Sequence, residues 1–183
     1  MSLIQNLLKM ENQNRMKQIK VGKITLNIGV GEPGNNLDKA VKLLQRITDA
    51  NPVKTKTMRR IPTFGIRPGL EIGTKVTLRK KKAEQVLAQL LKAVDNNIPE
   101  RKFDKFGNVS FGIKEYIDIP GIEYDPDMQI IGLEVAVTLT RAGYRIKDRL
   151  QKSKIGSSHL ITKQEAIDFM KEKFNVHEIK EEQ

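Results

Sequence analysis

The chain has 183 residues, with 33 Lys and Arg against 22 Asp and Glu, a formal net charge of +11 and no cysteine. This length fits one domain whose core is large enough to fold without covalent cross-links. The lack of cysteine excludes disulfides, thiolate catalysis and cysteine-based zinc sites, and the charge favours nucleic acid over an acidic small substrate.

The first twenty residues are expected to be a lead-in, either flexible or a short helix. Their apolar run is too short for a signal peptide or a membrane span, and no later segment approaches the length of a membrane helix. We expect a single domain over residues 21–183, in which residues 141–183 form a basic extension and a C-terminal helix.

The first unit of this domain is a strand followed by a helix. Apolar and polar residues alternate over residues 23–30, as in a half-buried strand. After a glycine-rich turn, apolar residues recur at helical spacing over residues 37–47, and Asn35 or Asn36 is expected to cap this helix. Asn51-Pro52 ends the unit because the residue before a proline disfavours helix.

A long basic arm, residues 59–70, joins two predicted strands at residues 53–58 and 72–79. Residues 53–82 contain ten Lys and Arg and one acid, Glu71. A charge run is often only a solvated surface, but a loop of this length in a compact domain is usually functional or disordered. We expect the arm to have no secondary structure, to carry Ile61, Phe64 and Ile66 at its tip, and to dock on a folded RNA.

The rest of the chain continues the alternation of helices and strands. Residues 83–98 have the clearest helical pattern, which Pro99 should end, and residues 108–113 and 134–140 alternate as strands around an acidic, turn-rich segment. Residues 141–163 are a second basic tract, expected to be partly flexible. Thr162 and Glu165 form a capping box for a helix at residues 163–174, and residues 178–183 are an acidic tail.

These elements predict an α+β fold with a mostly antiparallel sheet of four to five strands and helices on one face. Because the strands alternate, the other face should stay open to solvent or a ligand. Its residues are polar or basic: Lys23, Thr25, Asn27, Lys75, Thr77, Arg79, Ser110, Gly112, Thr138 and Thr140. None of them is aromatic, so contacts to phosphate and 2′-hydroxyl are expected rather than base stacking.

A second class of function stays open at this point. Gly29, Gly31 and Gly34 match the G-x-G-x-x-G pattern between a strand and a helix, as a nucleotide-dependent enzyme would require. However, the preceding strand alternates, and Lys54 and Lys56 stand where an acid should hold the ribose. The two histidines, His159 and His177, have no neighbouring ligand at metal-binding spacing. We therefore expect no enzyme, metal or cofactor, and a general nucleic-acid binder is the third alternative.

Four segments carry a family resemblance: KITLNIGVGEPG from residue 23, TFGIRPGLEIGTKVTLR from 63, FDKFGNVSFGIKEYIDIPGIEYDPD from 103 and RIKDRLQKSKIG from 145. In this order they resemble the large-subunit ribosomal protein five family, over about residues 21–174. The last segment and the C-terminal helix resemble its archaeal and eukaryotic branch, from which residues 1–9 depart.

The resemblance implies a structural protein of the central protuberance that binds 5S rRNA through the open sheet face and helps attach it to large-subunit rRNA. The 5S contacts would fall on Asn27, Asn51, Lys54, Lys75, Thr77 and Arg79. The arm would contact the P-site tRNA through Arg60, Ile61, Pro62, Thr63, Phe64, Gly65, Ile66 and Arg67. Further rRNA contacts are expected at Arg141, Arg145, Lys147, Arg149, Lys152 and Lys154.

The remaining partners that the resemblance implies are proteins. They are neighbouring central-protuberance proteins and a small-subunit head protein, whose contact we assign to the acidic residues 118–127. The chain would then be a monomer within the ribosome, cytoplasmic and without a membrane contact.

Overall fold

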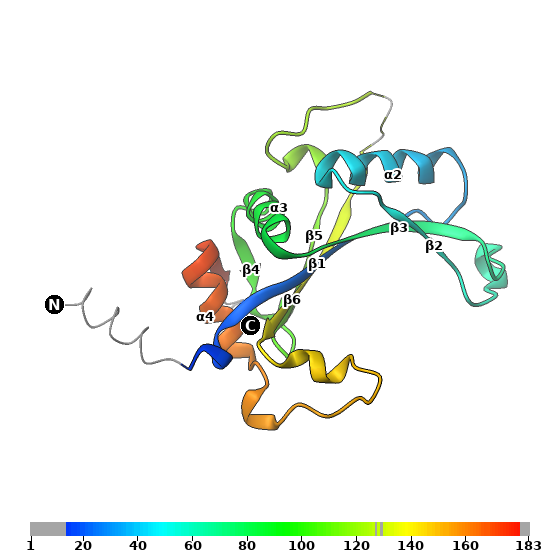
Figure 1. Cartoon of the computed structure of the whole chain (residues 1–183). Coiled ribbons are helices and arrows are strands. Elements are labelled where there is room, and N and C mark those ends of the chain that lie inside the picture. The colour runs from blue at the N-terminus through cyan, green and yellow to red at the C-terminus, as the bar shows by residue number, and fades with distance from the viewer. Residues whose placement is uncertain (1–13, 127, 129, 180–183) are drawn as a thin grey trace.

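A computed structural model describes residues 14–126, 128 and 130–179 of the chain (Figure 1). Most of the predicted lead-in and the end of the predicted acidic tail lie outside these residues. The described part of the lead-in holds a short 3-10 helix, Arg15–Lys17, and the start of the first strand. That strand, β1 (Ile19–Gly29), therefore begins four residues before its predicted start.

Five strands form one antiparallel sheet in the order β2-β3-β1-β6-β5. The long β1 lies in the centre, and the other strands are β2 (Val53–Lys56), β3 (Glu71–Leu78), β5 (Asn108–Ile113) and β6 (Leu133–Arg141). The predicted fold class is thus confirmed. β2 is two residues shorter than predicted, and its register against β3 shifts between Thr55 and Lys56.

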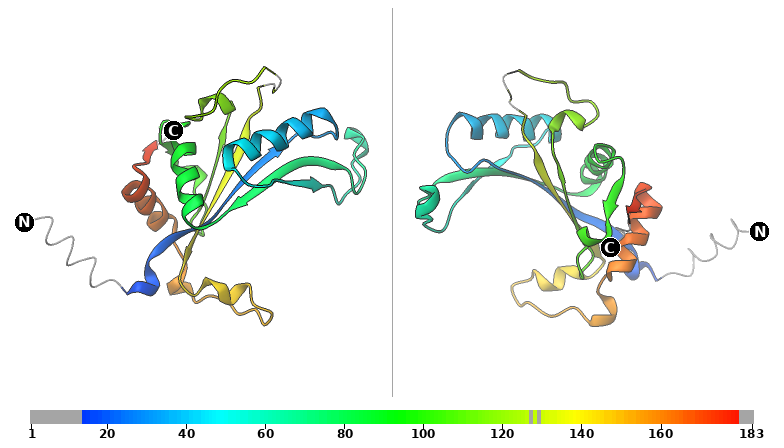
Figure 2. Two further views of the ribbon diagram at one scale, coloured as in Figure 1. Left: turned by 45° about the horizontal axis from the view of Figure 1, so that its top comes forward. Right: turned by 180° about the vertical axis from the view of Figure 1, so that it is seen from behind.

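Two helices, α2 (Asn35–Thr48) and α3 (Lys80–Lys92), cover one face of this sheet (Figures 1 and 2). Their apolar stripes pack against the inward residues of the central strands, among which Ile24 and Leu26 are fully buried. A stripe of this kind removes apolar surface from water and holds each helix in place. Within the described residues, no helix is long and apolar enough to cross a membrane.

The third helix, α4 (Lys163–Phe174), lies beside α3 (Figure 2). The predicted capping box is present, since the Thr162 side chain accepts from the Glu165 N–H and the Glu165 carboxylate accepts from Thr162. Gly107 fixes the contact between α4 and the start of β5: it has φ +75°, and a Cβ there would lie 2.5 Å from Cγ2 of Ile161.

Three predicted helix ends are wrong, and the first is the start of α3, which begins at Lys80 rather than at residue 83. α3 stops at Lys92 because Asp95 and Asn96 adopt positive φ, a conformation that short polar side chains tolerate. Ile98 is buried instead in β4 (Asn97–Pro99), which pairs in parallel with β7 (His177–Ile179) where an acidic tail was expected. The N-cap of α2 is Gly34, without a side-chain hydrogen bond, rather than Asn35 or Asn36.

Candidate nucleic-acid interface

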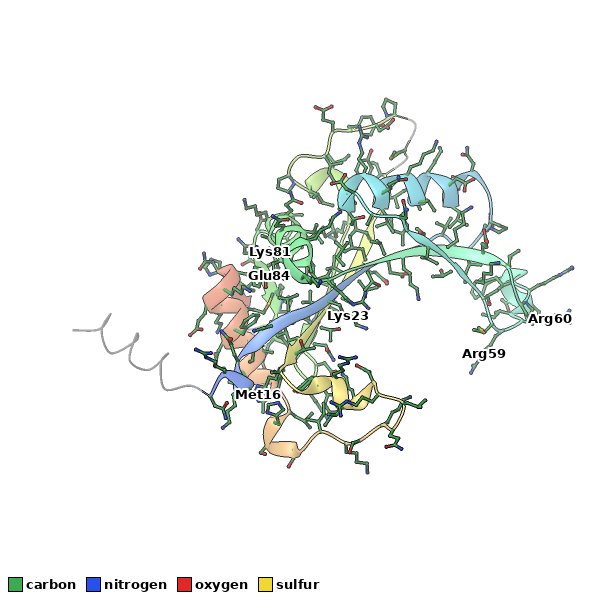
Figure 3. All side chains as sticks on the ribbon, viewed as in Figure 1. Met16, Lys23, Arg59, Arg60, Lys81 and Glu84 are labelled. Carbon is green, nitrogen blue, oxygen red and sulfur yellow. The ribbon has the colours of Figure 1, made fainter. Side chains whose placement is uncertain are left out.

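The face of the sheet opposite α2 and α3 is polar and open to solvent, as predicted. Cross-strand pairing places three rows of side chains together on it: Lys75, Asn27, Glu134 and Gly112; Thr77, Thr25, Ala136 and Ser110; and Lys23, Thr138 and Asn108. All of them are exposed or half-buried. Figure 3 shows Lys23 on this side of β1, with Lys81 and Glu84 of α3 on the other. We call this surface the open face.

A β-bulge concentrates positive charge at one end of the open face. The register of β1 against β6 shifts between Val21 and Lys23, so Lys20 lies opposite Thr140 and Lys23 opposite Thr138. Gly22 makes this possible, because a Cβ there would lie 2.6 Å from the Thr140 methyl carbon. Two cations beside two hydroxyls suit a phosphate group. Sequence reasoning missed Lys20, although a glycine inside a strand is a signal for a bulge.

The predicted 5S contacts divide into two groups in the structure. Asn27, Lys75 and Thr77 lie together on the open face, and Arg79 follows directly as the exposed N-cap residue of α3. Asn51 is exposed just before β2.

Lys54 lies on the other face, because its partner in the sheet is the buried Thr74. Its ammonium donates to Asp38 of α2 at 2.8 Å and lies 3.7 Å from Glu71. The hydrogen bond to Asp38 raises the pKa of Lys54, and the same bond lowers the pKa of Asp38. Lys54 therefore ties the edge strand to α2 and does not share a surface with Asn27.

The arm is a compact hairpin rather than the predicted irregular loop. Ile61 and Ile66 exchange both backbone hydrogen bonds, at 2.9 and 3.1 Å, around a 3-10 helix at Pro62–Phe64. Gly65 closes the turn with φ +66°, a conformation for which glycine is suited. Phe64 is 74% exposed at the tip, whereas Ile66 is only 8% exposed. The expectation that Ile66 presents an apolar group at the tip is therefore wrong.

Three exposed arginines flank this tip in the sequence: Arg59, Arg60 and Arg67. Figure 3 shows Arg59 and Arg60 at the outer end of the arm, well away from Lys81 and Glu84 of α3. One exposed aromatic ring between guanidinium groups can stack on a base while the cations hold phosphates.

The second basic tract is a loop whose two ends are fastened together. Residues 142–160 leave the sheet after Arg141 and lie on the side away from α2 (Figure 1). Tyr144 Oη accepts from Ile161 N at 2.9 Å and donates to the His159 carbonyl at 3.2 Å. His159 Nε2 is 2.8 Å from the Ala142 carbonyl oxygen. We call residues 142–160 the basic loop.

Arg141 makes three of the hydrogen bonds that hold the base of the basic loop, and it is only 8% exposed. Its guanidinium donates to the carbonyl oxygens of His159 and Leu160 at 3.3 and 3.1 Å and to the Glu165 carboxylate at 2.7 Å. Burial raises the pKa of Glu165, but the Thr162 N–H and Arg141 together outweigh it, so this pKa lies below its usual value. Arg141 was predicted to contact rRNA, yet its guanidinium faces the protein.

The other predicted cations of the basic loop are exposed: Arg145, Lys147, Arg149, Lys152 and Lys154. Lys147 lies 5.5 Å from the centre of the Tyr144 ring. The loop thus displays five cations on a base that Arg141 and Tyr144 hold, and the expected partial flexibility of this tract stays a prediction.

The acidic segment at residues 118–127, which we assigned to a protein contact, is held by hydrogen bonds to the buried Tyr116. Tyr116 is fully buried, and its hydroxyl lies 3.2 Å from Asp125 N and 3.3 Å from the Met128 carbonyl oxygen. Asp125 also pairs with Arg46 of α2 at 3.3 Å. Asp127, one of the assigned residues, lies outside the described part of the chain.

The glycine-rich turn does not form a nucleotide site. The N–H groups of Val30 and Gly31 both donate to the Ile72 carbonyl, at 3.0 and 2.9 Å, so they are unavailable to a pyrophosphate. The strand before the turn is antiparallel to both of its neighbours, whereas the dinucleotide fold needs a parallel sheet. This removes the structural basis of the enzyme alternative.

Comparisons with known proteins identify the family to which the chain belongs. Two family models match consecutive parts of the chain: ribosomal protein L5 over residues 14–67 and the C-terminus of the same ribosomal family over residues 71–169. Three similar proteins, all called large ribosomal subunit protein uL5, come from Sulfolobus acidocaldarius, Nanoarchaeum equitans and Methanosphaera stadtmanae. They are 47%, 50% and 46% identical to the chain over 91%, 90% and 89% of its length, and over 94%, 98% and 98% of theirs. The chain therefore belongs to the ribosomal protein L5 family, whose members are structural, non-enzymatic constituents of the ribosome.

Proposed function

We propose that the chain is a constituent of the large ribosomal subunit that binds 5S rRNA through the open face and helps attach it to large-subunit rRNA. The observation that carries the proposal is that Lys75 and Asn27 form one cross-strand row beside the row of Thr77 and Thr25, all of them exposed or half-buried on the open face. Lysines supply attraction to phosphates, and the amide and hydroxyl groups can hydrogen-bond ribose and phosphate of a folded RNA.

Two projections extend this surface to other partners. The arm, with Phe64 between Arg60 and Arg67, is proposed to contact the P-site tRNA, and the basic loop is proposed to contact large-subunit rRNA. The acidic segment after Tyr116 is proposed to meet a small-subunit head protein, and other surfaces to meet neighbouring proteins of the central protuberance. In this proposal the chain acts as a monomer within cytoplasmic ribosomes.

The decisive experiment is a filter-binding titration of the full chain with 5S rRNA, tRNA and a random RNA duplex over a range of salt concentrations. We expect 5S rRNA to bind most tightly, because the open face combines phosphate contacts with fixed hydroxyl and amide groups. Its log affinity should fall linearly with log salt, with a slope of about −0.7 to −0.9 for each phosphate contact. Equal affinity for the three RNAs at every salt concentration would contradict the proposal.

Replacing Thr77 by valine should weaken 5S binding by about 1–3 kcal/mol, because a polar group of the RNA loses its partner in the interface. Valine keeps the size and β-branching of threonine, and Thr77 is exposed on its strand, so the sheet should be unaffected. Thr63→Val is the matched control, because it makes the same change at an exposed threonine of the arm, outside the open face. An equal loss in both variants would contradict the assignment of the 5S contact to Thr77.

A further inference from the structure

One acid lies in the middle of the otherwise neutral and basic open face. Glu134 on β6 is directly opposite Asn27 on β1, which in turn lies opposite Lys75 on β3. The Glu134 side chain is exposed. Among the residues that the structure describes, no lysine or arginine forms an ion pair with it. A surface that served only to attract phosphates would be better without this carboxylate, because it repels them.

The carboxylate fixes the orientation of its neighbour. Nδ2 of Asn27 donates to Oε2 of Glu134 at 3.2 Å. With Nδ2 directed towards Glu134, Oδ1 of Asn27 is left as an acceptor. A carboxylate has two oxygens with about four acceptor positions, so Glu134 keeps most of its capacity after this bond. The pair therefore presents several hydrogen-bond acceptors and a negative charge, a combination that selects for N–H donors over phosphate oxygens.

The surroundings of the pair leave room for a flat ligand. Gly112 lies opposite Glu134 on β5, and Gly29 follows Asn27 by two residues on β1. A Cβ at Gly112 would meet only a carbonyl oxygen 3.9 Å away, and a Cβ at Gly29 would meet nothing within 4 Å. Ala136, the next residue of β6 on the same face, is also small and exposed. A planar ring can therefore approach the acceptors without displacing side chains.

We propose that Asn27 and Glu134 form a base-recognition position that takes an unpaired guanine of the bound RNA through its Watson–Crick edge. That edge carries two adjacent donors, N1–H and the N2 amino group, which match the two oxygens of a carboxylate. In single-stranded segments of RNA such edges are free to be read by side chains. Glu134 then determines specificity, while Lys20, Lys23 and Lys75 supply general affinity. This inference rests on the proposed binding of RNA to the open face.

The test is Glu134→Gln, measured against 5S rRNA and against a random duplex of equal length. Removing a negative charge from a surface that only attracts RNA would strengthen binding to both. We expect the reverse for 5S rRNA: its affinity should fall about tenfold, as for the loss of a charged hydrogen bond, while duplex affinity rises. Kethoxal, which modifies N1 and N2 of unpaired guanine, should be excluded from at least one 5S guanine by the wild type and not by the variant.

Glu123→Gln is the matched control, because it removes one exposed acid of the segment after Tyr116 with the same change of charge. It should shift binding to both RNAs in the same direction and leave kethoxal protection intact. If Glu134→Gln strengthens or leaves unchanged the binding of 5S rRNA, or if guanine protection is the same in both proteins, the inference is wrong. The proposed function would survive that result, since it fails only when the wild type has no preference for 5S rRNA.

Discussion

Replacing Arg141 by methionine should lower the free energy of unfolding by about 2–4 kcal/mol. The guanidinium is buried and bonds the carbonyl oxygens of His159 and Leu160 and the Glu165 carboxylate. Loss of one partner from a buried charged pair costs about 3–5 kcal/mol. Here the cost is reduced because the Glu165 side chain is 42% exposed and can be hydrated. Urea denaturation followed by circular dichroism would measure the change.

Limited proteolysis would locate the effect of Arg141→Met. Without the hydrogen bonds of Arg141 at its base, the basic loop should be cleaved faster than in the wild type. Cleavage should begin between residues 142 and 160. Arg149→Met is the matched control, because Arg149 belongs to the same loop and is exposed; it should leave both stability and cleavage near wild-type values. Equal stability of the two variants would show that Arg141 does not hold the loop.

The elements whose local signals agreed with their tertiary environment were predicted correctly from the sequence. α4 has the predicted bounds because its capping box and apolar stripe act locally, and β5 has them because period-two alternation matches a strand with one buried face. The open face followed from the same alternation. An all-polar side on consecutive strands has to face solvent or a ligand, whatever the order of the strands in the sheet.

Other features depend on contacts between distant segments, which one sequence does not display. Ile98 continues the apolar spacing of α3, but it is buried through the parallel pairing of β4 with β7, far away in sequence. Ile66 is buried although its bridge partner Ile61 is 40% exposed, so its burial depends on how the hairpin folds. Arg141 is one cation in a run of cations, and only the return of the chain at residues 159–165 gives its guanidinium three partners.

In the candidate interface, too, some placements follow from local alternation and others depend on contacts between distant segments. Asn27, Lys75 and Thr77 could be placed on one surface because each strand alternates. The position of Lys54 on the opposite face depends on the register of β2 against β3, which pairs it with Thr74. The hydrogen bond from Asn27 to Glu134 likewise requires that β6, which lies more than a hundred residues later in the chain, pairs with β1.

Replacing Lys147, Arg149, Lys152 and Lys154 together by glutamine should lower the affinity for large-subunit rRNA fragments about a thousandfold at ~0.1 M salt. These four cations project from the basic loop and are exposed. If each of them contacts a phosphate, the variant releases about four fewer counterions, and the slope of log affinity against log salt should become less negative by about 3. The fold should persist, because the bonds of Arg141 and Tyr144 at the base of the loop are unchanged.

The control for this variant removes the same charge elsewhere. Lys42, Lys92, Lys102 and Lys105 are exposed and lie outside the open face, the arm and the basic loop, and their joint replacement by glutamine should change the salt slope by less than about 1. A basic loop whose two ends are bonded together has fewer conformations to lose on binding than an open chain has. Equal losses of affinity in the two variants would mean that net charge alone attracts the RNA. A loss confined to the first variant would assign the contact to the fastened loop.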